Sequence, residues 1–234
     1  MSRVVLHEPG LMVADTVLPP GAFKALGRDV ANGEFRGVHA QKWDKSWRLW
    51  DGNPLRGESV YFDPRGLFGW KGAAYPTGSA VDLLIEQLRA WSGAHPELVG
   101  VEGIDWFALY LSPWIYPVGS ALSLHQDGAK YSGAFTYFVH SQWRTHWGGE
   151  LLVSRLDGMA AAPSAPAACD GDAPWMSEDG NGDADPGGIA TCVTPLPNRL
   201  VLLGPDRPHR VARVDHNAGL HVRASIAGFF LRAP

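Results

Sequence analysis

Residues 120–140 read SALSLHQDGAKYSGAFTYFVH and contain two short strand-like runs. The runs are SLHQD (123–127) and AFTYFVH (134–140), and glycines lie between them. Short runs with many apolar residues, bounded by glycine, are typical of β-strands joined by turns. The stretch therefore predicts β-structure in this part of the chain.

Runs of the same kind lie on both sides of this stretch. They are WFALYL (106–111), GELLV (149–153), RLVLL (199–203), HRVARV (209–214) and HVRASIAGFFL (221–231). With weaker candidates they give about eight strands without intervening helices, which favours two packed sheets in a jelly roll. We therefore predict an all-β core with a helical cover on its N-terminal side.

Two α-helices are predicted before residue 104. One runs from Pro20 to Ala31, and the other runs from Ser79 to about Ser92. Apolar residues recur at helical spacing in both segments. Ser79 is expected to cap the second helix, with Asp82 completing a capping box.

The length of 234 residues suits a single domain, 1–234. Within it we expect an N-terminal helical and aromatic cover at 1–103 and a jelly-roll core at 104–234. Residues 157–190 are rich in Ala, Pro, Gly and Asp. This composition predicts a flexible insertion, and whether it acts as a lid stays open.

The composition also limits which partners and which cellular location we expect for the protein. A net charge of −4 gives no electrostatic reason to expect nucleic acid or an anionic membrane as partner. No apolar run is long enough for a transmembrane helix, and the N-terminus lacks the apolar core of a secretory signal. Two cysteines do not suggest a disulfide framework. We expect a cytoplasmic protein and leave its oligomeric state open.

The motif His125-x-Asp127, followed much later by His209, suggests a metal site. On an extended strand, side chains two positions apart point to the same face, so His125 and Asp127 can bind one ion together. Taken alone, the pair is more typical of an exposed histidine near a turn aspartate. His209 follows a proline-bounded turn and opens another strand. Two imidazoles and one carboxylate form the ligand set of a non-haem iron(II) site with open coordination positions.

A second histidine–carboxylate pair at this spacing is His95-x-Glu97. It follows a helix end, where no strand holds both side chains on one face, so we do not expect it to bind a metal. His7 and His39 have no partner within reach in the sequence.

Arg223 and Ser225 lie on one face of the predicted strand 221–231, opposite Ala224 and Ile226. A buried guanidinium needs an anion, and its planar fork fits a carboxylate. An organic acid bound between the metal and Arg223 would meet this need. A structural ion pair with a nearby Asp or Glu is the alternative.

Aromatic residues are candidates for the walls of a substrate pocket, because such pockets are lined by aromatics with a few polar groups. We single out Trp43, Trp47, Arg48 and Trp147. The tryptophans could equally brace the sheet against the helices. We expect a small molecule, such as an amino acid or natural-product intermediate, as the substrate.

Several motifs occur in one order: His-x-Asp, Gly-Gly-Glu-Leu, Pro-Asn-Arg-Leu-Val-Leu, Pro-His-Arg-Val and Arg-x-Ser. In this order, residues 105–232 resemble the 2-oxoglutarate- and iron(II)-dependent dioxygenases, and the prolyl-hydroxylase-like branch is the most similar. The resemblance implies a double-stranded β-helix, which is a jelly roll. It also implies oxygen-dependent hydroxylation of an unactivated C–H bond, with succinate and CO2 as co-products.

The resemblance assigns roles to individual residues. The implied iron(II) ligands are His125, Asp127 and His209. The implied anchor for the distal carboxylate of 2-oxoglutarate is Arg223 with Ser225. Tyr116 matches the Tyr-x-x-Gly that precedes His-x-Asp in this branch, which implies a contact with the co-substrate or the substrate.

One departure bears on the substrate. Leu122 stands where the prolyl-hydroxylase-like pattern often has a second tyrosine, which weakens the case for peptidyl-proline. Two alternatives therefore stay open beside a small-molecule hydroxylase. One is a protein side-chain (prolyl-type) hydroxylase, and the other is a cupin-like metal-binding protein or isomerase without 2-oxoglutarate chemistry.

Overall fold

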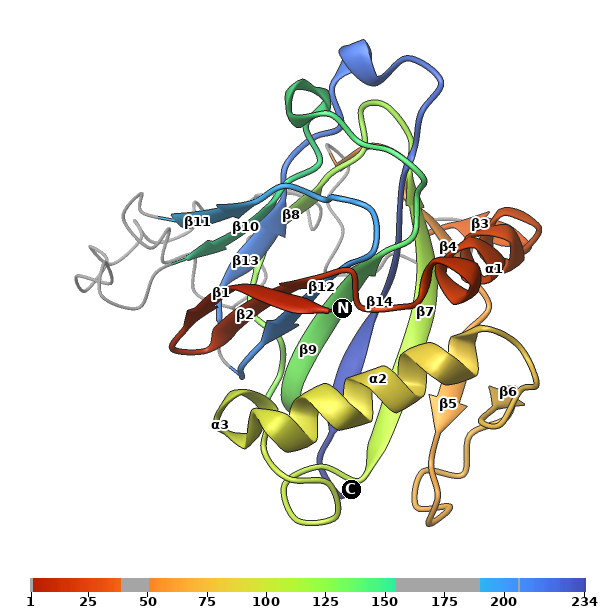
Figure 1. Ribbon diagram of the computed structural model, residues 1–234, viewed down its shortest axis with the longest axis vertical. Helices are drawn as coiled ribbons and strands as arrows, with labels where there is room; N and C mark the ends of the chain where they lie inside the picture. Colours follow the sequence, from red (N-terminus) through yellow and green to blue (C-terminus); the bar gives the residue numbers. More distant parts are fainter. Residues whose placement is uncertain (1, 39–50, 155–189, 206) are drawn as a thin grey trace, which may run out of the picture.

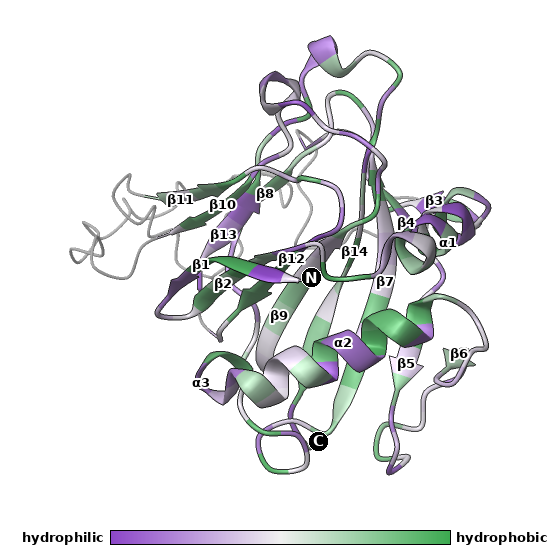
Figure 2. Ribbon diagram, in the orientation of Figure 1, coloured by the Kyte–Doolittle hydropathy of each residue, from purple (hydrophilic) through white to green (hydrophobic). Residues whose placement is uncertain are grey.

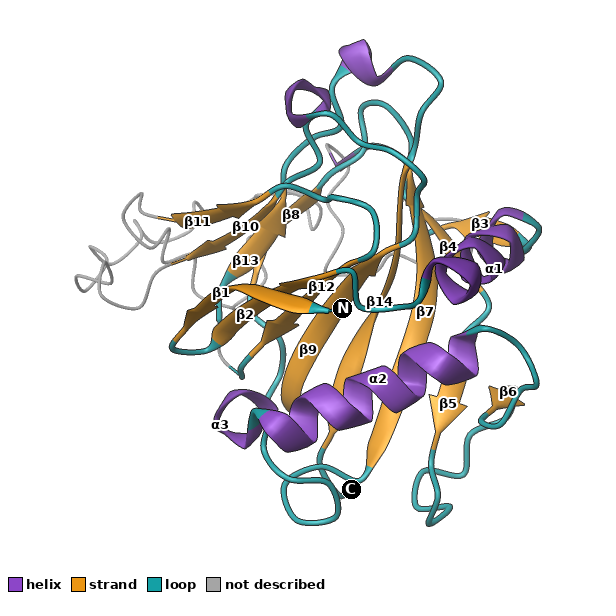
Figure 3. Ribbon diagram, viewed as in Figure 1, coloured by secondary structure: helices purple, strands orange, loops and turns teal. Residues whose placement is uncertain are grey.

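The computed structural model describes residues 2–38, 51–154, 190–205 and 207–234, and strands dominate these parts of the chain (Figure 3). The larger sheet contains β1 (Arg3–Glu8), β2 (Leu11–Asp15), β3 (Phe35–Gly37), β4 (Leu55–Gly57), β5 (Val60–Phe62), β6 (Ala73–Ala74), β7 (Ala108–Tyr116), β9 (Tyr131–Phe138), β12 (Arg199–Leu203) and β14 (Arg223–Leu231). The smaller sheet contains β8 (Leu122–His125), β10 (Leu151–Ser154), β11 (Ala190–Val193) and β13 (His209–Val211).

The strands from β7 onward are divided equally between the two sheets (Figure 1). In the larger sheet the neighbours run β12-β9-β14-β7, and in the smaller sheet they run β11-β10-β13-β8. The chain passes back and forth between two facing sheets, and this arrangement is a jelly roll. The predicted all-β core is therefore confirmed.

The larger sheet is apolar on both faces, because alternate side chains along a strand point to opposite sides. On β12, Leu200 and Leu202 belong to the core cluster under the helices. Val201 and Leu203 belong to a second cluster that fills the space between the sheets. The central strands therefore support the helices on one face and the interior of the jelly roll on the other.

Helices cover the outer face of the larger sheet. They are α1 (Pro20–Ala31), α2 (Val81–Ala94) and the short α3 (Pro96–Val99). In Figure 1, α2 lies across β9, β14 and β7, and Figure 2 shows apolar and hydrophilic stretches alternating along it. Leu84, Ile85 and Leu88 are fully buried there. Each such side chain contributes about 1.5–3 kcal/mol of burial free energy.

The start of α2 differs from the predicted capping box. The helix begins at Val81, and no side chain caps it. The carboxylate of Asp82 instead accepts hydrogen bonds from the backbone N–H groups of Thr77 at 2.9 Å and Gly78 at 2.8 Å. Asp82 therefore closes the preceding turn, which leaves Ser79 outside the helix.

The expectation of a purely helical and aromatic cover at 1–103 is not confirmed. This segment also supplies β1–β6 to the larger sheet. β2 runs antiparallel to β12 with Asp15 opposite Arg199, and these two side chains form an ion pair with a 2.6 Å N–O distance. The segment therefore shares a hydrogen-bonded sheet with the core, and the single-domain division stays a prediction.

The predicted insertion 157–190 lies outside the described residues, except that Ala190 begins β11. β10 and β11 are antiparallel neighbours, with Ser154 opposite Ala190. The insertion therefore connects two paired strands. Within the described ranges, none of the helices combines the length and the apolar character needed to cross a membrane.

Candidate metal centre

The pairing of β8 and β13 brings His125, Asp127 and His209 together. His125 ends β8, His209 begins β13, and the two residues lie opposite each other in the sheet. Their ring centroids are 4.3 Å apart, and Nε2 of His125 lies 3.8 Å from Oδ1 of Asp127. A ligand atom from each of the three residues lies within 4.8 Å of one from each of the others. The three predicted ligands thus converge on one point.

Backbone carbonyl groups orient both imidazole rings. Nδ1 of His125 lies 2.9 Å from the carbonyl oxygen of Ser123, and Nδ1 of His209 lies 2.8 Å from that of Arg207. In the Nδ1–H tautomer each ring donates to its carbonyl oxygen, so the lone pair of Nε2 is available to bind a metal. This is the usual arrangement of a histidine that binds a metal through Nε2.

Burial affects the protonation of two of the three ligands. Burial, helped by the neighbouring His209, lowers the pKa of His125 to about 3, so this ring is neutral at neutral pH. Burial raises the pKa of Asp127, and the nearby His209 offsets part of this rise. Two neutral imidazoles and one carboxylate fit an iron(II) ion.

Two residues that the sequence analysis missed support these carbonyl groups. Asp51 is buried, and its carboxylate accepts hydrogen bonds from the Ser123 hydroxyl at 2.8 Å and the Ser123 N–H at 3.2 Å. Arg207 is also buried and donates to the carbonyl oxygen of Pro9, and its guanidinium lies 3.6 Å from Glu8. The turn between β1 and β2 therefore holds the loop that carries His209. Only the proline-bounded turn around Arg207 hinted at this in the sequence.

Arg223 is buried between the two sheets, with 1% of its surface exposed. Its Nε donates to the carbonyl oxygen of Gly149 at 2.7 Å, and its Nη1 donates to the Ser225 hydroxyl at 3.3 Å. The guanidinium also lies 4.9 Å from the ring centroids of both Tyr116 and Phe138. These contacts fix its position but do not neutralise its charge.

No carboxylate among the described residues lies within ion-pair distance of Arg223. Burial lowers its pKa to about 10, and the nearby Tyr116 and Glu150 offset part of this effect, so the group stays charged at neutral pH. A buried charge without an ion-pair partner is costly. In the described part of the chain, the alternative of a structural ion pair is therefore not realised, and the site favours an external anion.

Tyr116 is the cross-strand neighbour of Arg223 and is likewise buried. Burial raises the pKa of its phenol, an effect that the charge of Arg223 partly offsets. The hydroxyl therefore stays protonated at neutral pH and can donate a hydrogen bond.

The predicted pocket residues are placed only in part. Trp43, Trp47 and Arg48 lie outside the described residues. Trp147, in the short η2 helix (Thr145–Trp147), is buried in the cluster between the sheets. It stacks on His221 at a centroid distance of 4.5 Å and meets Trp143 edge-on at 5.3 Å. Its present contacts are packing contacts, and its role in substrate binding stays a prediction.

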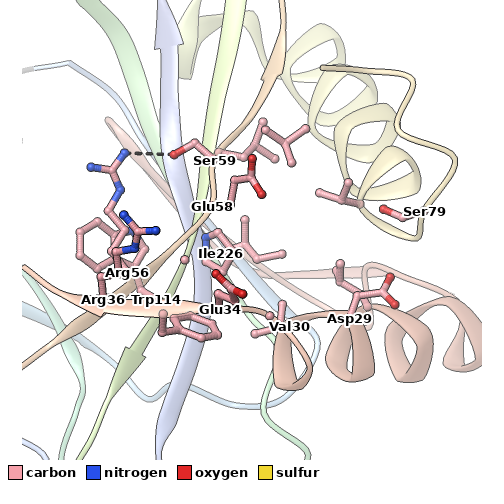
Figure 4. A pocket seen from close by; sticks show the side chains of 18 of the residues that line it. Asp29, Val30, Glu34, Arg36, Arg56, Glu58, Ser59, Ser79, Trp114 and Ile226 are labelled. Atoms are coloured by element: carbon pink, nitrogen blue, oxygen red, sulfur yellow. Dashed lines mark hydrogen bonds between the residues drawn. The ribbon is translucent and has the colours of Figure 1, made fainter. Parts of the chain in front are cut away.

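Two cavities lined by described residues do not include the three converging ligands. A cavity of about 750 Å³ lies between α1 and strands β3, β4, β5 and β7, on the outer side of the larger sheet. Figure 4 shows Arg36, Arg56 and Trp114 on one side of this cavity and Asp29 and Ser79 on the other. A smaller cavity of about 230 Å³ lies beside β8 and β13. None of the three converging ligands lines either cavity.

His95 and Glu97 lie close together although no strand holds them, and the expectation that they do not bind a metal stays untested. Nδ1 of His95 lies 3.2 Å from Oε1 of Glu97, at the corner between α2 and α3. Nε2 of His7, on β1, lies 3.2 Å from the same oxygen. The corner between two helices therefore brings the two side chains together, which we had expected only of a strand.

Comparison by sequence finds no relatives. A scan against models of known protein families gives no match, and a search of curated proteins gives no similar sequence.

Comparison by structure does find relatives. A prolyl-4-hydroxylase from Pseudomonas putida is 18% identical with a TM-score of 0.59, over 95% of this chain and 93% of that one. A protein of the 2OG-Fe(II) oxygenase family from Burkholderia pseudomallei is 12% identical with a TM-score of 0.57, over 96% and 85%. A prolyl hydroxylase from Trichoplax adhaerens, in complex with a peptide fragment of the hypoxia inducible factor oxygen degradation domain, is 14% identical with a TM-score of 0.56, over 96% and 84%. The chain therefore has the fold of prolyl-hydroxylase-like 2-oxoglutarate–iron(II) oxygenases, as the motif order predicted.

Proposed function

We propose that the protein is a 2-oxoglutarate-dependent iron(II) dioxygenase that hydroxylates an unactivated C–H bond. The observation that carries the proposal is the convergence of His125, Asp127 and His209 where β8 pairs with β13. When bound, iron(II) with 2-oxoglutarate and O2 supplies the oxidising power, and succinate and CO2 are the co-products.

The chain's own residues hold and orient the reactants. His125, Asp127 and His209 would bind iron(II) on one side and leave the other side open. The carbonyl groups of Ser123 and Arg207 keep both Nε2 atoms directed at the ion. Because the rings are already oriented, little conformational freedom is lost when the metal binds.

Arg223 and Ser225 would hold the distal carboxylate of 2-oxoglutarate. The guanidinium is charged and buried, and the hydroxyl of Ser225 lies 3.3 Å from it, so both can donate to one anion. The protonated hydroxyl of Tyr116 supplies a further donor on the neighbouring strand. The apolar cluster around these groups keeps water away from the anion, which strengthens each hydrogen bond.

Two substrate classes fit this function. A small molecule agrees with the sequence expectation. A protein side chain of the prolyl type is a second candidate, because similar structures are prolyl hydroxylases and one of them holds a peptide. A cupin-like protein or isomerase would have no use for an Arg223 that lies between the sheets without an ion-pair partner among the described residues.

Anaerobic titration with iron(II) and 2-oxoglutarate tests the co-substrate and the ligand set together. A visible charge-transfer band is expected in the wild-type protein and should vanish in His209→Ala. Arg223→Leu should weaken 2-oxoglutarate binding by about 30-fold, since losing one partner of a buried charge pair costs ~2 kcal/mol or more.

Arg89→Gln is the matched control, because Arg89 already pairs with Glu102 at 2.9 Å. It should leave the titration unchanged. The proposal fails if no band forms at any iron concentration, or if Arg223→Leu and Arg89→Gln bind 2-oxoglutarate equally well.

The substrate class is tested by release of CO2 from 2-oxoglutarate. Free amino acids and proline-containing peptides are supplied in parallel, and the set that stimulates release identifies the class. Stimulation by peptides alone would contradict the small-molecule expectation.

A further inference from the structure

A second group of potential metal ligands lies on the surface at His7, His95 and Glu97. His7 comes from β1, the edge strand of the larger sheet, and the other two come from the corner that begins α3. A ligand atom from each of the three lies within 4.8 Å of one from each of the others. The fold thus joins two elements that are far apart in the sequence.

We propose that His7, His95 and Glu97 form a second metal site, which takes a divalent transition-metal ion of the zinc class. Two imidazoles and a carboxylate suit such an ion, and water can complete the coordination. The site is separate from the predicted iron centre and does not rest on the proposed dioxygenase activity.

The distances fit a shared ion. Nε2 of His7 and Nδ1 of His95 each lie 3.2 Å from Oε1 of Glu97. In a tetrahedral zinc site with bonds of roughly 2.0–2.1 Å, neighbouring ligand atoms are about 3.3 Å apart. The two distances to Glu97 are therefore those expected of ligands of one ion, and the ligand atoms of the two histidines lie within 4.8 Å of each other.

Hydrogen bonding accounts for only part of this arrangement. The contact between His95 and Glu97 has the geometry of a hydrogen bond. The contact of His7 with the same oxygen is an ion-pair distance without that geometry. A cation between the three groups would replace both contacts with metal–ligand bonds.

Neighbouring rings hold the histidines in place. His95 stacks on Trp91 with an interplanar angle of 12°, and it meets His7 edge-on at a centroid distance of 5.1 Å. The backbone N–H of His95 donates to the carbonyl oxygen of Trp91 at 3.0 Å. Side chains that are already held in position favour metal binding.

The proposed site would tie the edge strand to the helix corner. β1 pairs only with β2 among the described strands. An ion that binds the folded protein and not the unfolded chain stabilises the fold by mass action. Zinc should therefore raise the unfolding temperature in addition to binding.

The test uses the full-length His125→Ala/His209→Ala variant, so that the predicted iron centre cannot bind zinc. Calorimetric titration should show one Zn²⁺ per chain. Adding His7→Ala or Glu97→Gln should weaken binding by at least about tenfold, since even residues outside the ligand shell affect metal affinity by ~10–100-fold. Both side chains are largely exposed, at 41% and 53%, so these changes should leave the fold intact.

His216→Ala is the matched control. His216 is 84% exposed and lies 3.1 Å from Asp215, but it has no third ligand in the described part of the chain. This control should bind zinc like the parent variant. Equal affinities for His7→Ala and His216→Ala, or no zinc binding by the parent variant, would overturn the proposal.

Cobalt(II) gives an independent readout in the otherwise wild-type chain. A four-coordinate site gives visible d–d absorption, and its intensity should fall in His7→Ala and not in His216→Ala. This comparison keeps the proposal testable if the double variant does not fold.

Discussion

His140, two residues after the end of β9, is a partly buried titratable group that the proposed reaction does not use. Its Nε2 lies 2.5 Å from the carbonyl oxygen of Pro195, and its Nδ1 lies 3.2 Å from the backbone N–H of Ala224. In the Nε2–H tautomer the ring donates to the first group and accepts from the second. It therefore links the segment before β12 to β14, next to Arg223.

This histidine should make stability depend on pH. Burial lowers its pKa to about 4, whereas an unfolded chain takes up the proton near pH 6.5. The unfolded state thus binds more protons between these values, and the free energy of unfolding falls as the pH falls through this window. Between pH 7 and pH 5 the loss due to His140 is about 2 kcal/mol.

Urea unfolding at pH 7 and pH 5 measures the effect. His140→Gln cannot titrate and should lose less stability than the wild-type protein over this range. The exposed His216→Gln should behave like the wild type. Identical pH dependence in all three proteins would contradict the role assigned to His140.

For individual residues, the sequence predicted the side chains that converge, but it did not predict the residues that hold the neighbouring backbone carbonyl groups in place. The His-x-Asp and Arg-x-Ser spacings predicted that His125 lies near Asp127 and Arg223 near Ser225, although β8 ends at His125 and Asp127 follows it in a loop. Asp51 and Arg207 could not be found in this way, because they act on backbone carbonyl groups through contacts that only the folded chain creates.

Among the secondary-structure elements and their turns, the turn before β10 leaves little room for a side chain at Gly149. Its φ is +70°, and a Cβ atom there would lie 2.9 Å from Cδ of Arg223 and 3.3 Å from the Trp143 ring. Gly219 has a similar φ of +59°, but a Cβ atom there would meet open space. Comparing the same substitution at the two glycines therefore distinguishes the cost of backbone strain from the cost of crowding.

Gly149→Ala should be more destabilising than Gly219→Ala. Both variants carry the strain of a left-handed residue, about 1–2 kcal/mol. Gly149→Ala also crowds Arg223, and overpacking adds roughly 1–3 kcal/mol. Denaturant unfolding gives the difference, and 2-oxoglutarate binding should weaken only in Gly149→Ala. Equal losses of stability would show that Arg223 has room to move.

The strands of the jelly roll were predictable because each is a continuous apolar run between turns. The strands β1–β6 were not, because most are very short and gain their partners from distant parts of the sequence. β2 is an example: its pairing with β12 joins Asp15 to Arg199, and no local pattern encodes that pairing.

The pairing of β2 with β12 affects how the whole molecule is expected to unfold. The N-terminal strands, the helices and the jelly roll share one larger sheet, and Leu26 and Leu84 are buried in the same cluster as Phe135. Elements that share a core are expected to unfold together.

We therefore expect a single cooperative unfolding transition. Tryptophan fluorescence and far-ultraviolet circular dichroism should give coincident curves in urea. Two separated transitions would contradict the single-domain prediction and would suggest a boundary near residue 103.

The hydrogen-bonded ladder between β10 and β11 has a practical consequence for protein engineering. Ser154 and Ala190 face each other across it, so the sheet fixes the two ends of whatever connects them. If the connection is flexible, as its composition predicts, lengthening it costs only about 0.6 kcal/mol for each doubling. A reporter domain or an affinity handle grafted between these strands should therefore leave the fold in place.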